Sequence, residues 1–171
     1  MVEVRTVNAT EGRQYIGTLA RVLIDCVESG ASVSFMSPLS IEKAESFFEK
    51  VFDGIERNER ILLAAFEGDE LLGTVQIVTA MPENQPHRAD IAKLLVHRSA
   101  RNKGIGEQLM TRAEEVAKLA GKTLLVLDTV TGAAGERLYE RLGWTKAGVV
   151  PNYARLPDGT PCSTTIFWKA V

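Results

Sequence analysis

The sequence has little of the residue types that build metal sites and disulfide scaffolds. It contains only two cysteines, Cys26 and Cys162, and two histidines, His87 and His97. Neither pair has the spacing of zinc ligands, and two distant cysteines are too few to staple a fold. We therefore expect no bound metal and a reduced, cytoplasmic protein.

Long apolar runs and charge of one sign are missing as well. No stretch approaches the roughly 18 apolar residues of a membrane span, and the first ten residues lack the layout of a secretory signal. The 20 Lys and Arg residues nearly balance the 22 Asp and Glu residues, for a net charge of −2. This balance argues against a nucleic-acid partner, as the missing apolar run argues against a membrane partner, while it leaves room for a local basic patch that holds a small phosphorylated ligand.

What remains is the composition of an ordinary globular domain. Apolar residues make up 45% and charged residues 25% of the 171 residues. A chain of this length buries about 70% of its unfolded surface and needs no staple to fold. We expect a single domain over residues 1–171.

Hydrophobic periodicity and turn residues predict a β-α-α-β-β-β-α-β-α-β-β order. Thr10 is expected to cap the first helix, Gly30 to end it, and Ser40 to begin the second. One helix connects strands 89–97 and 123–129, which should therefore be parallel neighbours in a mixed sheet of the α/β class. The other expected strands are 3–7, 60–67, 71–80, 144–150 and 163–169, and the later helices are 104–120 and about 133–142.

The most informative segment is RNKGIG, from Arg101 to Gly106, between a predicted strand and a predicted helix. Gly104 and Gly106 let the backbone turn tightly and leave amide N–H groups uncovered by side chains. The start of the helix adds unpaired N–H donors and a partial positive charge. With Arg101 and Lys103 beside it, this glycine loop predicts a site for an anion, most often phosphate or pyrophosphate.

The loop alone has two other interpretations. It matches the first two glycines of the dinucleotide fingerprint G-x-G-x-x-G, and Asp128 stands where such folds hold a ribose, but Leu109 replaces the third glycine. The loop can also be a glycine-rich helix start that binds nothing.

A longer pattern around the loop resembles the GNAT superfamily of acetyl-CoA-dependent N-acetyltransferases. The first block is ADIAKLLVHRSARNKGIGEQLMTRAEEVAK, residues 89–118, and the second is LLVLDT followed by AGERLYERLGW, residues 124–144. The resemblance implies a GNAT-like fold, with a mostly antiparallel sheet whose central parallel pair splays to bind CoA and about four flanking helices. It also implies an enzyme, an acyltransferase that acts without a metal.

Within GNAT, the chain resembles the tabtoxin-resistance acetyltransferase type. This likeness covers most of the chain and is carried by GASVSFM (30–36), RADIAKLLV (88–96), LLVLDT (124–129) and PNYARLPDGTP (151–161). Many GNAT members place an asparagine seven residues before the tyrosine of the second block, where this chain has Gly132. The tabtoxin-resistance type shares this change.

The resemblance assigns residues to the cofactor. The pyrophosphate of CoA would sit on the glycine loop, and the pantetheine arm would add itself like a strand to the preceding strand, because an unpaired strand edge matches its two amides. The residues implied are Leu94, Leu95, Val96, Arg101, Asn102, Lys103, Gly104, Ile105, Gly106 and Glu107.

Three residues are candidates for the chemistry. Tyr139 matches the family tyrosine that protonates the departing thiolate, and its alternative is a structural tyrosine with a hydrogen-bonded hydroxyl. Asp90 is a candidate general base, with pairing to Arg88 as the alternative. Asp128, at the end of a buried strand, would accept the amine proton or bind the substrate ammonium after losing part of its hydration. The alternative is that Asp128 caps the turn around Gly132.

The acceptor rests on the resemblance alone. We expect direct attack by a primary amine of a small, amino-acid-like, toxin-like or antibiotic-like compound, and a homodimer is a further expectation. A protein N-terminus or lysine as the acceptor, or an acyl-CoA sensor without catalysis, are the alternatives. The residues expected to frame the acceptor are Ser32, Phe35, Met36, Asn152 and Tyr153.

Overall fold

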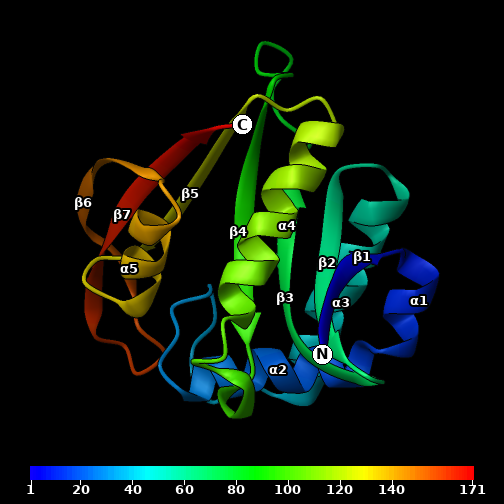
Figure 1. Ribbon diagram of the computed structural model, residues 1–171. Helices are drawn as coiled ribbons and strands as arrows, with labels where there is room; N and C mark the ends of the chain where they lie inside the picture. Colours follow the sequence, from blue (N-terminus) through cyan, green and yellow to red (C-terminus); the bar gives the residue numbers. More distant parts are fainter.

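The computed structural model describes residues 1–171 and contains one seven-stranded sheet with the strand order β1-β2-β3-β4-β5-β7-β6 (Figure 1). Only β4 and β5 run parallel, so the predicted mixed α/β sheet with one parallel pair is confirmed. The strands are β1 (Val2–Val7), β2 (Arg60–Glu67), β3 (Glu70–Val78), β4 (Arg88–Val96), β5 (Leu124–Val130), β6 (Thr145–Arg155) and β7 (Pro161–Ala170). The helices are α1 (Ala9–Gln14), α2 (Ile16–Glu28), α3 (Ile41–Glu56), α4 (Ile105–Leu119) and α5 (Ala134–Arg141), with a short 3₁₀ helix η1 (Arg98–Ala100).

The first predicted helix is wrong in its cap and its continuity. Asn8, not Thr10, is the N-cap, and its side chain accepts a hydrogen bond of 2.9 Å from the Glu11 amide. The helix breaks at Tyr15, whose ring packs edge-on against Phe66 with 5.3 Å between the ring centroids. Two shorter helices therefore replace one long one. Ser40 caps α3 as predicted.

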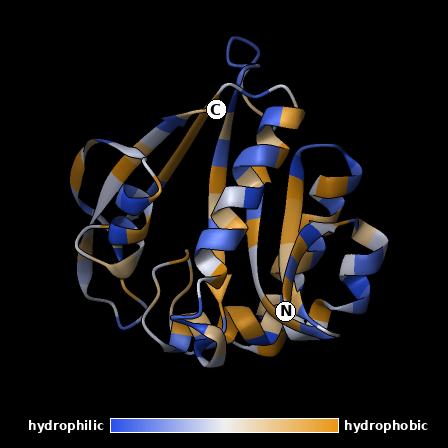
Figure 2. Cartoon of the chain, viewed as in Figure 1, coloured by the Kyte–Doolittle hydropathy of each residue, from blue (hydrophilic) through white to orange (hydrophobic).

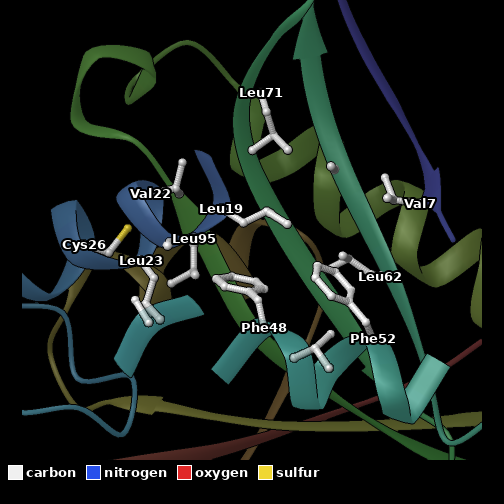
Figure 3. Packing of buried hydrophobic residues seen from close by; sticks show 14 of the residues in the cluster. Val7, Leu19, Val22, Leu23, Cys26, Phe48, Phe52, Leu62, Leu71 and Leu95 are labelled. Atoms are coloured by element: carbon white, nitrogen blue, oxygen red, sulfur yellow. The ribbon is translucent and has the colours of Figure 1, made fainter. Parts of the chain in front are cut away.

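Two apolar layers hold the helices to the two faces of the sheet. The α1, α2 and α3 side buries a cluster that includes Phe48, Phe52 and Leu62 (Figure 3). Burying a phenylalanine of this kind contributes about 2–3 kcal/mol. Helices α4 and α5 cover the opposite face, and polar residues follow the solvent side of α4 (Figure 2). None of the helices combines the length and apolar character that a membrane span needs.

The parallel pair β4–β5 is joined for only three residues. Arg88 to Asp90 pair with Leu124 to Val126, and beyond this point the two strands diverge toward the start of α4 (Figure 1). β4 then keeps only β3 as its neighbour, while β5 stays paired with β7. The result is a fork in the middle of the sheet, open from Ile91 on β4 and Leu127 on β5.

A bulge in β4 lies at this fork. Thr74 and Gln76 of β3 face Leu95 and Ala92 of β4, so two residues of β4 stand opposite one of β3. Lys93, one of the two, has a left-handed backbone with φ of +53°. A bulge bends its strand, sharpens the local twist and can aim a side chain off the regular alternation.

Candidate active site

The glycine loop presents a row of free backbone donors. Asn102 (φ +60°) and Gly104 (φ +75°) both adopt the left-handed conformation, and α4 begins directly afterwards. The six consecutive N–H groups from Asn102 to Glu107 donate to no group of the chain, and the first bonded amide is that of Gln108, 3.0 Å from the Gly104 oxygen. With the positive end of the helix dipole behind them, these amides form a site suited to an anionic group such as pyrophosphate.

A buried carboxylate of α2 braces the segment that leads into this loop. Asp25 of α2 is 8% exposed and accepts a hydrogen bond of 2.8 Å from the backbone of Arg98 and another from its guanidinium. Burial opposes its charge, but the hydrogen bonds from Arg98 outweigh this effect and lower the pKa of Asp25. Sequence reasoning missed Asp25, because nothing local marks a residue of an amphipathic helix as the partner of a loop 73 residues later.

Arg101 belongs to the same brace. Its Nε donates to the Val96 carbonyl oxygen at 2.9 Å, and its guanidinium also approaches Asp25 at 3.5 Å and the Cys26 sulfur at 3.6 Å. The guanidinium of Arg101, expected to lie beside the bound anion, therefore contacts β4 and α2 instead. Lys103 stays exposed and free of ion pairs. The open edge of β4 beyond the bulge carries Leu94 and Val96, with Val96 already accepting from Arg101.

Tyr139 points from α5 into the layer between α5 and the sheet. It is 7% exposed and packs between Trp144 and Phe167, with ring centroids 6.1 and 5.9 Å away. Burial, with a smaller contribution from the negative charge of Asp128, raises the pKa of Tyr139 to about 12. Burial and the charge of Asp128 account for this shift, and no hydrogen bond from another group of the chain contributes to it.

Asp128 lies on the β5 side of the fork and is more accessible than its position after an apolar run predicts. The side chain is exposed, and one carboxylate oxygen accepts a hydrogen bond of 2.7 Å from the Thr164 hydroxyl of β7. The expected loss of hydration is therefore wrong. The alternative role as a cap of the following turn is also wrong, because the Gly132 amide donates to Glu136.

Glu136 holds the turn that leads into α5. It is 9% exposed, accepts from the Gly132 amide, and lies 3.4 Å from Lys146 and from the Thr165 hydroxyl. The bond from Gly132 is the largest cause that lowers the pKa of Glu136. Gly132 itself has φ of +79°, which explains a glycine at this position.

Asp90 sits in the part of the sheet where β4 and β5 are still paired. Its carboxylate forms an ion pair with the Arg88 guanidinium, as the alternative interpretation predicts. Asp90 pairs with Val78 of β3 and Val126 of β5. It therefore lies in the last paired position of β4 and β5, before the two strands diverge.

A cavity of about 300 Å³ opens beside Asp128, between the α2–α3 loop, the end of β5 and the β6–β7 hairpin. We call it the β5–β7 cavity. It collects four of the five residues expected around an acceptor, and Asn152 alone is not part of its wall. The wall consists of Ser32, Ser34, Phe35, Met36, Asp128, Thr129, Val130, Tyr153, Ala154, Arg155, Cys162, Ser163 and Thr164.

Lys93 is a further residue at the fork that sequence reasoning missed. Its Nζ donates to the Ser34 hydroxyl at 3.0 Å, and Ser34 lines the cavity. Burial lowers the pKa of Lys93, while the nearby negative charge of Asp128 opposes this shift. A lysine inside the otherwise apolar run IAKLLV is the signal that could have marked it.

The comparisons with known proteins agree with this geometry. Residues 28–144 match the model of the acetyltransferase (GNAT) family. Three solved structures share the fold over 99% of this chain at 16–18% identity. A Salmonella typhimurium protein assigned as an acetyltransferase, solved with its cofactor acetyl-CoA, has a TM-score of 0.79 and is covered over 93% of its length.

The other two differ in the acceptor that their names give. A ribosomal-protein-alanine N-acetyltransferase from Brucella melitensis has 18% identity and a TM-score of 0.78, with 99% of its chain covered. A structure assigned as a phosphinothricin N-acetyltransferase has 16% identity and a TM-score of 0.81, with 98% covered. At these identities the likeness concerns the fold, whereas the family match spans more than half of the chain. The chain belongs to the GNAT acetyltransferase family, whose members use acetyl-CoA, and it is an acyltransferase.

Proposed function

We propose that this protein is an N-acetyltransferase that moves the acetyl group of acetyl-CoA directly to a primary amine of a small, amino-acid-like acceptor, as in the tabtoxin-resistance type. The observation that carries the proposal is the β5–β7 cavity, which places the Asp128 carboxylate beside the open fork of the sheet. One sheet joins both ends of the chain, and we take residues 1–171 as a single catalytic domain.

The residues around the fork suit the two halves of CoA. The free amides from Asn102 to Glu107 would bind the pyrophosphate, with the exposed Lys103 beside them. The backbone of Leu94, Leu95 and Val96 lies where pantetheine would pair with β4. Arg101 would act on the loop through its bond to Val96.

Two side chains would handle the protons. The amine nitrogen attacks the thioester carbon, the C–S bond breaks, and the amine proton passes to Asp128, whose carboxylate is accessible from the cavity. Tyr139, whose phenol is kept protonated by burial, would give its proton to the departing thiolate. After the products leave, Asp128 would release the amine proton to solvent and Tyr139 would regain a proton from solvent. The electrostatic influence of Asp128 on Tyr139 supports placing both near the same reacting atoms.

The two carboxylates have different places in this proposal. Asp128 lines the cavity, whereas Asp90 is ion-paired with Arg88 outside its wall. We assign the base to Asp128 and a supporting role to Asp90. Asp128→Asn should lower kcat/KM for the amine by about 100-fold, since a positioned base contributes roughly 10²–10⁴-fold. Asp90→Asn is the matched variant, and an equal or larger loss there would move the base to Asp90.

The size of the cavity favours a small acceptor. About 300 Å³ is at the lower end of the range for small-molecule sites. Its wall combines apolar groups of Phe35, Met36 and Tyr153 with hydroxyls such as that of Ser32. Both a small-molecule and a protein acceptor occur among the names of the similar structures, so the fold does not choose between them.

The decisive experiment is a thiol-release assay with acetyl-CoA and a panel of small amines, amino acids and β-lactam amino-acid analogues. We expect turnover with one class of amino acid, and calorimetry run in parallel should detect CoA binding. Turnover only with peptides that carry a free N-terminus or lysine would replace the small acceptor by a protein. CoA binding without turnover on any acceptor would indicate a sensor and overturn the proposal.

A further inference from the structure

We infer that Lys93 is a specificity-determining residue that binds an anionic group of the acceptor, a carboxylate in an amino acid, while Asp128 holds the amine at the other end. This inference rests on the proposed function and names the feature of the acceptor that the site selects. It is carried by the bulge in β4, by the incomplete pairing of the Lys93 ammonium, and by the charges around the β5–β7 cavity.

Lys93 lies in the bulge of β4, and its ammonium contacts the cavity wall from behind, through the hydroxyl of Ser34. In a regular strand, residue 93 would face the opposite side of the sheet from its neighbours at 92 and 94. Lys93 has a left-handed backbone here, and its ammonium donates to Ser34, which also has a left-handed backbone, with φ of +77°. Two non-glycine residues in this conformation meet at one hydrogen bond, and strained backbone of this kind clusters at ligand sites.

The ammonium is only partly satisfied. Lysine carries three donors, and the one partner of Lys93 is the neutral Ser34 hydroxyl at 3.0 Å. No carboxylate lies within 4.0 Å of its nitrogen, although the side chain is half-buried. Burial and the nearby positive charge of Arg60 both lower the pKa of Lys93, against the effect of Asp128. A half-buried cation without a counter-ion is stabilised by an anion that binds beside it.

Asp128 completes the complementarity. Its Oδ2 accepts from Thr164, and no cation lies within ion-pair distance of the carboxylate. The cavity therefore has a carboxylate on β5, and an ammonium lies behind Ser34. Neither group forms an ion pair, with the other or with a third residue. A molecule with an amine at one end and a carboxylate at the other matches both charges in one orientation. In that orientation the amine lies beside Asp128, whose negative charge also contributes to the raised pKa of Tyr139.

Arg155 is the competing cation. It lines the cavity too, but its side chain is exposed and its Nη1 donates to the Gly159 carbonyl at 3.0 Å in the β6–β7 turn. This position is at the rim of the cavity, where water screens the charge. We therefore assign the carboxylate to Lys93, and Arg155 provides the control.

The test compares matched pairs of acceptors, each amino acid against its carboxamide, in the thiol-release assay. Wild type should prefer the acid, and Lys93→Met should reduce the acid-to-amide ratio of kcat/KM by about 30-fold, the loss expected for one charged hydrogen bond. Methionine is unbranched and nearly as long as lysine but carries no charge, so the variant removes the ammonium and keeps most of the apolar side chain. Lys93→Arg should restore part of the ratio, and Arg155→Met should change acids and amides together.

A second readout does not depend on catalysis. Cys162 lines the cavity and Cys26 is 3% exposed, so Cys162 is the thiol that alkylating reagents reach first. A preferred amino acid should protect Cys162 from iodoacetamide in the CoA-bound wild type, and its carboxamide should protect less. In Lys93→Met this difference should vanish.

The outcomes separate the two proposals. If acetyl transfer to small amines occurs but the acid-to-amide ratio is unchanged in Lys93→Met, or falls only in Arg155→Met, the inference about Lys93 is overturned and the proposed function stands. If wild type acetylates no small amine at all, the proposed function fails, and the role of Lys93 fails with it.

Discussion

At the scale of single residues, Tyr139 gives the sharpest test of the chemistry. Tyr139→Phe removes one hydroxyl and leaves the packing against Trp144 and Phe167 in place. We expect kcat to fall by about 100-fold because the thiolate loses its proton donor. The affinity for CoA, measured by calorimetry, should stay within a factor of two or so, which separates a chemical role from a structural one.

The pH dependence follows from the same residue. Because the pKa of Tyr139 is raised to about 12, the phenol keeps its proton throughout the range in which kcat is measured. The profile of wild-type kcat should therefore show no descending limb from this group below about pH 10. A descending limb near pH 8 that disappears in Tyr139→Phe would contradict this assignment.

At the scale of elements, the glycine loop can be separated from ordinary helix ends. Gly104 and Gly121 flank α4 with φ of +75° and +80°, so alanine is strained by about 1 kcal/mol at either position. Only Gly104 belongs to the row of free amides. We expect Gly104→Ala to weaken CoA binding by about tenfold or more, whereas Gly121→Ala should lose a similar stability without any change in CoA affinity. Equal CoA affinity in both variants would exclude the loop as the pyrophosphate site.

The brace between α2 and the glycine loop has its own signature. Asp25→Asn keeps the shape of the side chain and removes the charge that faces Arg98, so the free energy of unfolding at pH 7 should fall by about 2 kcal/mol. The pKa of Asp25 is lower in the folded state than its ordinary value, so this stability is present above about pH 4 and is lost as the pH falls through the folded pKa.

Denaturant unfolding at several pH values tests this sign. The difference between wild type and Asp25→Asn should shrink as the pH is lowered from 5 toward 2. Glu59→Gln, which breaks an exposed pair with Arg57, is the control and should change stability very little. If the difference in the free energy of unfolding between wild type and Asp25→Asn stays constant with pH, the charge of the Asp25 carboxylate does not contribute to the stability of the brace.

The sequence predicts elements well where the signal is local. The glycine loop, the parallel strands and the α3 cap at Ser40 follow from patterns within a few residues. Tyr15, where the first helix breaks, packs against Phe66 of β2, and the partner of Asp25 is a loop far along the chain. The bulge at Lys93 depends on register with β3, which no single strand encodes. Tertiary partners decide these features, so they were not readable from local pattern.

At the scale of the whole molecule, the fork divides the sheet into two parts. Strands β1 to β4 form one part and β5 to β7 the other. Within the sheet, three residue pairs between the parallel strands β4 and β5 join the two parts. The β5–β7 cavity draws its wall from both sides, because the α2–α3 loop packs with the first part and the β6–β7 hairpin belongs to the second. A ligand seated in the fork would therefore connect the two parts as well as occupy a site.

This arrangement predicts where binding stabilises the fold. CoA at 100 times its Kd should add about 2.7 kcal/mol to the free energy of unfolding, which raises Tm by roughly 5–10 °C for a chain of this size. Hydrogen exchange should slow at Leu94, at Val96 and at residues 102–107, whose amides are free or lie on the open edge, and change little in β1 and β2. NAD at the same concentration serves as the comparison for the dinucleotide interpretation of the loop. A rise in Tm with NAD and none with CoA would reverse the assignment of the glycine loop, whereas protection by CoA confined to β1 and β2 would show that the ligand does not bind in the fork.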